Sequence, residues 1–127
     1  MSADIWLEDE DGVHVTIDSD PDAELRAMVP TRSAGGHDST TVNLTYNLSP
    51  MLWAAGMPQW KDMLHLRGAE AGPIWYKVAC ELRADPDRFR PYDAENGWGT
   101  LEDAQAAMDR LAMMCLAHPT AIVNGWL

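Results

Sequence analysis

The sequence predicts an α+β fold in which a small, largely antiparallel sheet packs against two main helices. Segments with strand-like alternation gather in the first part of the chain, and longer segments with helical spacing follow them. This order is typical of α+β proteins. A chain of 127 residues, of which 46% are hydrophobic, can enclose one core. Because no repeat or linker interrupts the chain, we expect a single domain over residues 1–127.

The central strand of this sheet is expected over residues 41–48. Apolar and polar residues alternate there, as in a strand with one buried face; the apolar residues are Val42, Leu44, Tyr46 and Leu48. Ser49 and Pro50 follow, and they suit the N-cap and first position of a helix. The polar row Asn43, Thr45 and Asn47 would then lie beside a helix N-terminus, where it could hold a ligand.

An N-terminal hairpin is expected around the turn at residues 9–12, which ends in an Asp-Gly pair. Residues 4–8 and 13–17 alternate on the two sides of this turn, which is a strong hairpin signal. The expected core face carries Ile5, Leu7, Val13, Val15 and Ile17, and the other face carries Trp6, His14 and Thr16. Residues 121–124 are a candidate closing strand.

The first main helix is expected from Gly68 to Ala84. Apolar residues recur at intervals of four, at Ile74, Val78 and Leu82. One position from this line lie Ala71, Trp75 and Ala79. Together these residues are typical of the core-facing stripe of a helix. Asp85 precedes a proline and is therefore biased away from the helical conformation. The helix should end there, and residues 87–99 are expected to form a loop.

The second main helix is expected to begin after Thr100. Thr100 and Asp103 have the spacing of a capping box, and His118-Pro119 ends the pattern. Its core residues repeat at three and four, and they are Leu101, Ala104, Met108, Leu111 and Cys115. Shorter helices are expected at residues 50–55 and 59–67.

Composition limits the classes of partner. A net charge of −11 argues against binding to nucleic acid or to an anionic membrane, because both require a positive face. A basic protein partner stays open. The chain has no leader-like start and no apolar run of about 18 residues, so we expect a cytoplasmic protein. Eight methionines and six tryptophans would place some apolar side chains at the surface, and we expect homo-oligomerisation.

Motifs for metal binding and catalysis are weak. Cys115 and His118 are the only ligand-like pair, and a structural zinc site needs a second pair, so we expect no metal and no cofactor. The sequence contains no nucleophile elbow and no phosphate-binding glycine loop. An enzyme is therefore the least favoured class.

The segment Asn96-Gly97-Trp98-Gly99 offers the best candidate site. Trp98 could stack a base or a partner side chain, and the helix start at Thr100 offers backbone N–H groups to an anion. Arg88 and Arg90 supply local positive charge. The candidate ligand site, for a small anionic and possible nucleotide ligand, comprises Asn43, Thr45, Asn47, Arg88, Arg90 and Trp98. In the alternative, Trp98 folds inward and fastens the loop to the core.

Three stretches carry a resemblance to known proteins: residues 4–9 (Asp-Ile-Trp-Leu-Glu-Asp), residues 43–51 with their Asn-Leu-Thr-Tyr-Asn segment, and residues 96–100 (Asn-Gly-Trp-Gly-Thr). In this order they resemble a family of small uncharacterised phage and prophage proteins. The resemblance implies a phage origin, hence the host cytoplasm, and an accessory role such as counter-defence. It implies no reaction.

Three functional hypotheses follow. The first is a non-enzymatic binding protein of phage type that captures a small ligand or a host protein. The second is an acidic protein–protein inhibitor that imitates nucleic acid, which would require contiguous exposed carboxylates. The densest acidic run is confined to residues 8–11. The third is a small enzyme.

Overall fold

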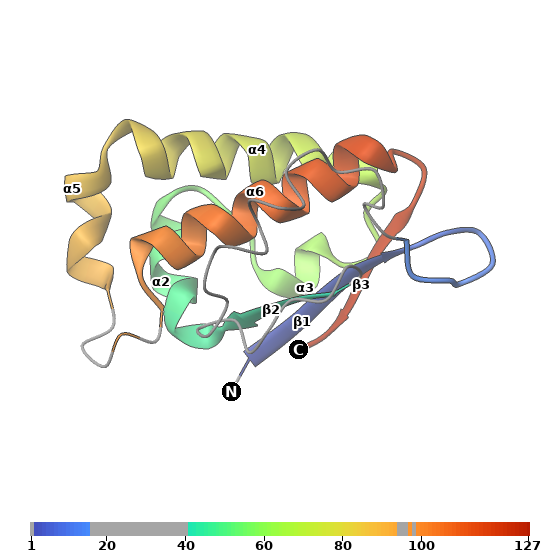
Figure 1. Ribbon diagram of the computed structural model, residues 1–127, viewed down its shortest axis with the longest axis horizontal. Helices are drawn as coiled ribbons and strands as arrows, with labels where there is room; N and C mark the ends of the chain where they lie inside the picture. Colours follow the sequence, from blue (N-terminus) through green and yellow to red (C-terminus); the bar gives the residue numbers. More distant parts are fainter. Residues whose placement is uncertain (1, 16–40, 94–96, 98) are drawn as a thin grey trace, which may run out of the picture.

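In the described part of the chain, three strands form an antiparallel sheet, and helices cover one of its faces (Figure 1). The computed structural model describes residues 2–15, 41–93, 97 and 99–127. The strands are β1 (Ser2–Glu8), β2 (Thr41–Thr45) and β3 (Ile122–Trp126), in the order β2-β1-β3. The predicted α+β class and the closing strand are confirmed.

The described helices comprise two long ones, α4 and α6, which lie side by side above the sheet (Figure 1), and several short ones. Their bounds are α2 Ser49–Ala54, α3 Trp60–Met63, α4 Gly68–Ala84, α5 Pro86–Phe89 and α6 Leu101–Ala117, with 3-10 turns η2 Tyr46–Leu48 and η3 Arg90–Tyr92. The expected range of α4 is confirmed. The expected loop at 87–99 is wrong at its start, because Pro86 and Pro91 both suit the first turn of a helix.

The core lies between the sheet and the two long helices. Its sheet side is formed by side chains that are at most 1% exposed: Ile5, Leu7, Val42, Leu44 and Val123. The helix stripes predicted from the spacing are buried against them, with Ile74 only half-buried at the margin. Trp75 and Leu111, both fully buried, are among the largest of these residues.

Helices α4 and α6 approach each other closely at the start of α4, where Gly68 and Gly72 face the end of α6. A Cβ atom on Gly68 would overlap the carbonyl oxygen of His118 and lie 2.8 Å from that of Cys115. One turn later, a Cβ atom on Gly72 would lie 3.0 Å from the Cβ of Cys115. Only glycine allows this backbone approach.

Strand β2 is shorter than predicted, because the chain turns into η2 at Tyr46. Thr45 is the N-cap of that turn, and its Oγ1 accepts a hydrogen bond from the Asn47 backbone N–H at 3.4 Å. Ser49 is not the N-cap of α2 but its first residue. Its buried hydroxyl instead accepts a hydrogen bond from the Trp60 indole Nε1 at 3.2 Å, so tertiary contact has overridden the local capping preference.

The hairpin is confirmed only at its turn. Asp9 Oδ1 accepts hydrogen bonds from the backbone N–H groups of Asp11 at 2.9 Å and Val13 at 3.0 Å. The returning arm is described only for residues 13–15, and there His14 forms an isolated bridge with Glu8. Val13 is 58% exposed, so its predicted place in the core is wrong, and residues 16 and 17 lie outside the described residues.

The capping box at the start of α6 is confirmed. Thr100 Oγ1 accepts from the Asp103 backbone N–H at 3.3 Å, and Asp103 Oδ2 accepts from the Thr100 backbone N–H at 3.0 Å. We expect T100A to lower the free energy of unfolding by about 1 kcal/mol, because it removes an acceptor from the helix start. Urea denaturation would measure this loss. T100S should retain most of the stability, and equal stability of T100A and the native protein would contradict the cap.

Candidate functional site

The outer face of the sheet, opposite the helices, carries an aromatic and polar cluster. Alternation along β1 directs Asp4, Trp6 and Glu8 to this face, because Ile5 and Leu7 are in the core. The register pairs Asp4 with Asn43 and Trp126, and pairs Trp6 with Asn124. We call these residues, together with His14, the outer-face cluster: Asp4, Trp6, Glu8, His14, Asn43, Asn124 and Trp126.

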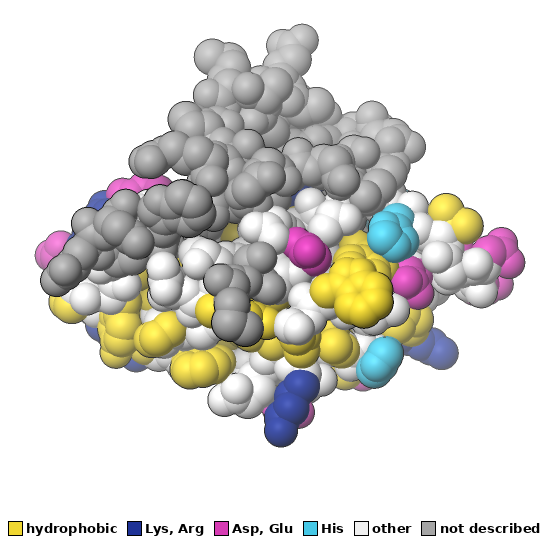
Figure 2. All heavy atoms as spheres, turned by 90° about the horizontal axis from the view of Figure 1, so that it is seen from below, with side chains coloured by type: hydrophobic (Ala, Val, Ile, Leu, Met, Phe, Trp, Pro, Cys, Tyr) yellow, Lys and Arg dark blue, Asp and Glu magenta, His cyan; other side chains and the backbone are white. Residues whose placement is uncertain are grey.

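Three rings form the apolar part of the outer-face cluster. The Trp6 and His14 rings stack with their centroids 4.7 Å apart and their planes at 23°. Trp126 lies tilted on Trp6, with centroids 6.3 Å apart and planes at 52°. Trp6 is only 7% exposed, whereas Trp126 is 73% exposed. Figure 2 shows hydrophobic side chains on this face beside acidic and histidine side chains. Trp126 therefore presents an indole to solvent on a rigid support.

The carboxylates of the outer-face cluster are held by the same strands. Glu8 Oε1 accepts hydrogen bonds from Trp6 Nε1 at 2.9 Å and from Asn124 Nδ2 at 3.2 Å. Asp4 Oδ1 accepts one from Asn43 Nδ2. Within the described residues, the second oxygen of each carboxylate accepts no hydrogen bond. The cluster thus offers two oriented acceptors beside an aromatic surface.

The polar row predicted on the central strand is only partly formed. Asn43 lies on the outer face and binds Asp4, but the strand ends at Thr45. Asn47 belongs to η2, and its backbone N–H binds the Thr45 side chain. Because the alternation stops there, these three side chains do not form one continuous strand face.

Arg88 and Arg90 are engaged in contacts within the chain. Arg88 Nη2 donates to the carbonyl oxygen of Ala54 at 2.7 Å, and its Nη1 lies 3.8 Å from Glu81. Arg90 forms a two-pronged pair with Glu102, at 2.9 and 2.6 Å. Both cations therefore already have anionic or carbonyl partners. Trp98 lies outside the described residues, so its predicted stacking role stays a prediction.

The segment before α6 does lie against the end of β2. A Cβ atom on Gly99 would be 3.1 Å from the Cβ of Asn47 and 3.2 Å from the Cγ2 of Thr45. Gly99 also has a φ of +112°, which glycine adopts at little cost. Gly99 therefore lies directly against Thr45 and Asn47.

The start of α6 is less suited to an anion than its sequence suggests. Asp93 Oδ1 already accepts a hydrogen bond from the Leu101 backbone N–H at 2.7 Å. Thr100 and Asp103 engage each other's backbone N–H groups. A phosphate would have to displace these acceptors and also meet the negative charge of Glu102, so the helix dipole here is already compensated.

The Arg90–Glu102 pair gives a direct test of this local electrostatic arrangement. Hydrogen bonds from Arg90 lower the pKa of Glu102 below its usual range. We expect R90M to raise the Glu102 pKa toward its ordinary value, as measured by an NMR titration of the side-chain carboxyl carbon. R83M, which removes the partner of Asp109 instead, is the matched control. An unchanged Glu102 pKa in R90M would contradict the pair.

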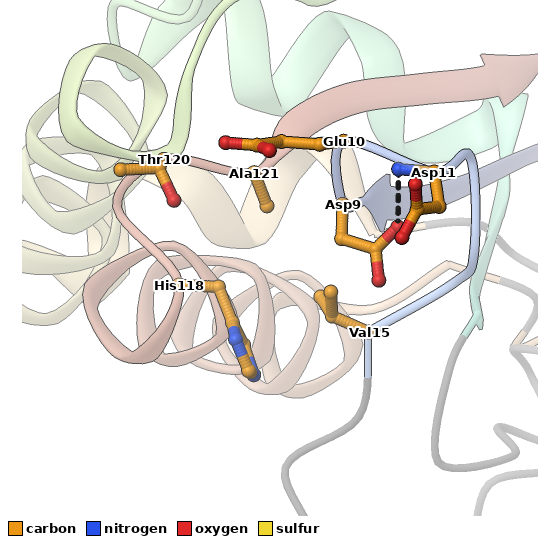
Figure 3. Close-up of a pocket in the computed structure, with 7 residues that line it drawn as sticks. All are labelled: Asp9, Glu10, Asp11, Val15, His118, Thr120 and Ala121. Carbon is orange, nitrogen blue, oxygen red and sulfur yellow. Dashed lines mark hydrogen bonds between the residues drawn. The ribbon is translucent and has the colours of Figure 1, made fainter.

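A shallow hollow of about 270 Å³ lies between the hairpin turn and the end of α6. Figure 3 shows its lining: Asp9, Glu10, Asp11, Val15, His118, Thr120 and Ala121. The Asp9 carboxylate folds back onto the Asp11 backbone N–H. Among the described residues, no group of three or more His, Cys, Asp or Glu side chains is placed to hold a metal ion.

Comparison with known proteins adds no assignment, since no protein-family model, curated protein or solved structure matches this chain. In the part of the chain that the structure describes, no helix is both long and apolar enough to cross a membrane. The phage resemblance and the site predicted at the start of α6 stay hypotheses. The outer-face cluster was missed because it joins β1 to β3, which are more than 110 residues apart in the sequence. Its available signal was the alternation of Asp4, Trp6 and Glu8.

Proposed function

We propose that this is a non-enzymatic binding protein that engages a protein partner through the outer-face cluster. The observation that carries the proposal is Trp126, which is 73% exposed, tilted against the Trp6 ring and paired across the sheet with Asp4. An aromatic side chain fixed on a sheet loses little conformational freedom when it binds. Exposed tryptophans are also enriched among the residues that dominate interface energy.

The exposure of Trp126 supports a protein or peptide rather than a small ligand. Small-molecule sites are usually concave and bury most of their ligand, whereas Trp126 is 73% exposed and belongs to β3, in the sheet that lies beneath α4 and α6 (Figure 1). For an accessory protein of phage type, as the resemblance implies, the partner would be a host protein in the host cytoplasm. Counter-defence would then act by occupying that protein.

The alternative of an acidic inhibitor imitating nucleic acid receives less support. Such a protein needs contiguous, unpaired carboxylates, but several described ones are paired with arginine. Asp109 pairs with Arg83, and Glu102 with Arg90. Among the described residues, the acidic side chains without an arginine partner are most concentrated in the hairpin turn, at Asp9, Glu10 and Asp11. Homo-oligomerisation stays a prediction, which sedimentation velocity over a range of concentrations would test.

The test is selection of binders from a displayed random-peptide library. We expect the peptides enriched on the native protein to bind W126A at least about tenfold more weakly, as for truncation of an interface hot spot. The matched control is Y76A, which removes a 59% exposed aromatic side chain from α4. It should leave these affinities within about twofold. Peptides that bind W126A and the native protein equally would overturn the proposal.

A further inference from the structure

We infer that the segment recognised by the outer-face cluster carries arginine side chains, so that guanidinium groups lie against the Trp126 indole and the carboxylates of Glu8 and Asp4. This inference rests on the proposed function and adds the chemistry of the partner. The proposed ligand is a peptide segment of a protein, and the test below distinguishes it from other ligands.

The charge of the outer-face cluster is complementary to a cationic partner. The outward-facing positions of the three strands include Asp4 and Glu8 but no lysine or arginine. The whole chain has a net charge of −11. An anionic partner would have to bring negative charge next to these carboxylates, whereas a cationic one would be attracted over a distance of about a Debye length.

The aromatic ring selects the kind of cation. A guanidinium group can stack flat on an indole and form a hydrogen-bonded pair with a carboxylate at the same time, which a lysine ammonium group does less well. Glu8 Oε1 is already occupied by Trp6 and Asn124, so this carboxylate is fixed in direction. Its remaining oxygen is the one available to a guanidinium N–H.

The spacing along β1 defines the probe. Asp4 and Glu8 point to the same side of one strand and are separated by four residues, which is about 13 Å. Trp6 lies between them, and Trp126 is paired with Asp4 across the sheet. An extended peptide with two arginines separated by three residues matches this distance. The probe is therefore fluorescein-Arg-Gly-Ser-Gly-Arg-amide.

The experiment is a fluorescence-anisotropy titration of the full chain with this peptide at about 150 mM salt, where attraction to the overall charge is screened. Citrulline replaces arginine in a second peptide, which keeps the shape and removes the charge, and lysine replaces it in a third. We expect the citrulline peptide to bind about tenfold more weakly, and the lysine peptide more weakly than the arginine peptide.

Variants separate local recognition from general attraction. E8Q retains an amide oxygen for Trp6 and Asn124 but removes the charge, and W126A removes the indole. Both should weaken the arginine peptide about fivefold or more. W126F keeps an aromatic ring, and D87N removes one exposed charge on α5. Both controls should stay within about twofold.

The possible failures are distinguishable. If the arginine peptide does not bind, if citrulline or lysine binds equally well, or if E8Q and D87N act alike, the arginine inference is overturned. The proposed function survives those results as long as W126A still weakens the library peptides. If W126A changes neither the arginine peptide nor the library peptides, both proposals are overturned.

Discussion

G68A is expected to lower the free energy of unfolding by about 3 kcal/mol, although alanine normally favours a helix over glycine by about 1 kcal/mol. The reason is the fixed backbone opposite this position. The added methyl group would meet the carbonyl oxygens of His118 and Cys115, and neither can turn away as a side chain could. The start of α4 is also tied to the chain after α6, because the Gly68 N–H donates to the carbonyl oxygen of Ala121 at 2.8 Å.

Urea denaturation of G68A and G56A would measure this effect against a matched change. Gly56 has a φ of +99° and nothing within 4 Å of an added Cβ, so G56A should cost only about 1 kcal/mol of backbone strain. A G68A protein as stable as the native one would contradict the close approach of α4 and α6. A G68A protein more stable than the native one would show that helix propensity alone decides this position.

The two long helices were predictable from sequence because their signals are local and agree with one another. The stripe containing Trp75 and Leu82, the break at Asp85 and the cap at Thr100 all lie within or directly beside the helices that they define. The closing strand was also predicted. Its place beside β1 was not, because nothing local in residues 122–126 specifies which strand they pair with.

The errors arose where a distant part of the chain overrode a local preference. Ser49 is a favourable N-cap residue, but its hydroxyl binds the distant Trp60 indole instead. The alternation of residues 13–17 predicts that Val13 faces the core. In the structure Val13 lies at the hairpin turn, outside the named strands, and its side chain is exposed.

Contacts between distant parts of the chain also decide the surroundings of the candidate-site residues. Arg88 and Arg90 were singled out as rare positive charges near the Gly97–Gly99 segment, but their pairing with Glu81 and Glu102 depends on how the helices pack. The exposed Trp126 received no weight, since its significance depends on Trp6 and Glu8 across the sheet. A surface assembled from two distant strands leaves only half of its pattern in either segment.

Burial of the Cys115 thiol should lower the free energy of unfolding in alkali. Substitution of Cys115 should remove this part of the pH dependence. The side chain is fully buried on α6, beside Gly72, and this burial raises the pKa of its thiol to about 12 from an ordinary value of 9.0. In the unfolded chain the thiol loses its proton near the ordinary value. The stabilising effect of the protonated thiol is therefore complete below about pH 9 and is lost as the pH rises toward 12.

The expected loss from this one group is about 1.4 kcal/mol between pH 8 and pH 10, since each tenfold change in proton concentration contributes up to about 1.36 kcal/mol. Urea denaturation at both pH values, in a reducing buffer, would measure it. C115A should be less stable at pH 8 because of the cavity that it leaves, but its free energy of unfolding should fall by about 1.4 kcal/mol less than that of the native protein on going to pH 10.

C80A is the matched control, because Cys80 is exposed on the neighbouring helix α4. All three proteins keep the same tyrosine and lysine side chains, so they differ only at a cysteine. An identical fall in C115A and C80A would mean that Cys115 loses its proton as easily in the folded protein as in the unfolded chain. The end of α6 would then admit water beside Cys115, and the tight seam formed with Gly68 and Gly72 could not be the stable arrangement in solution.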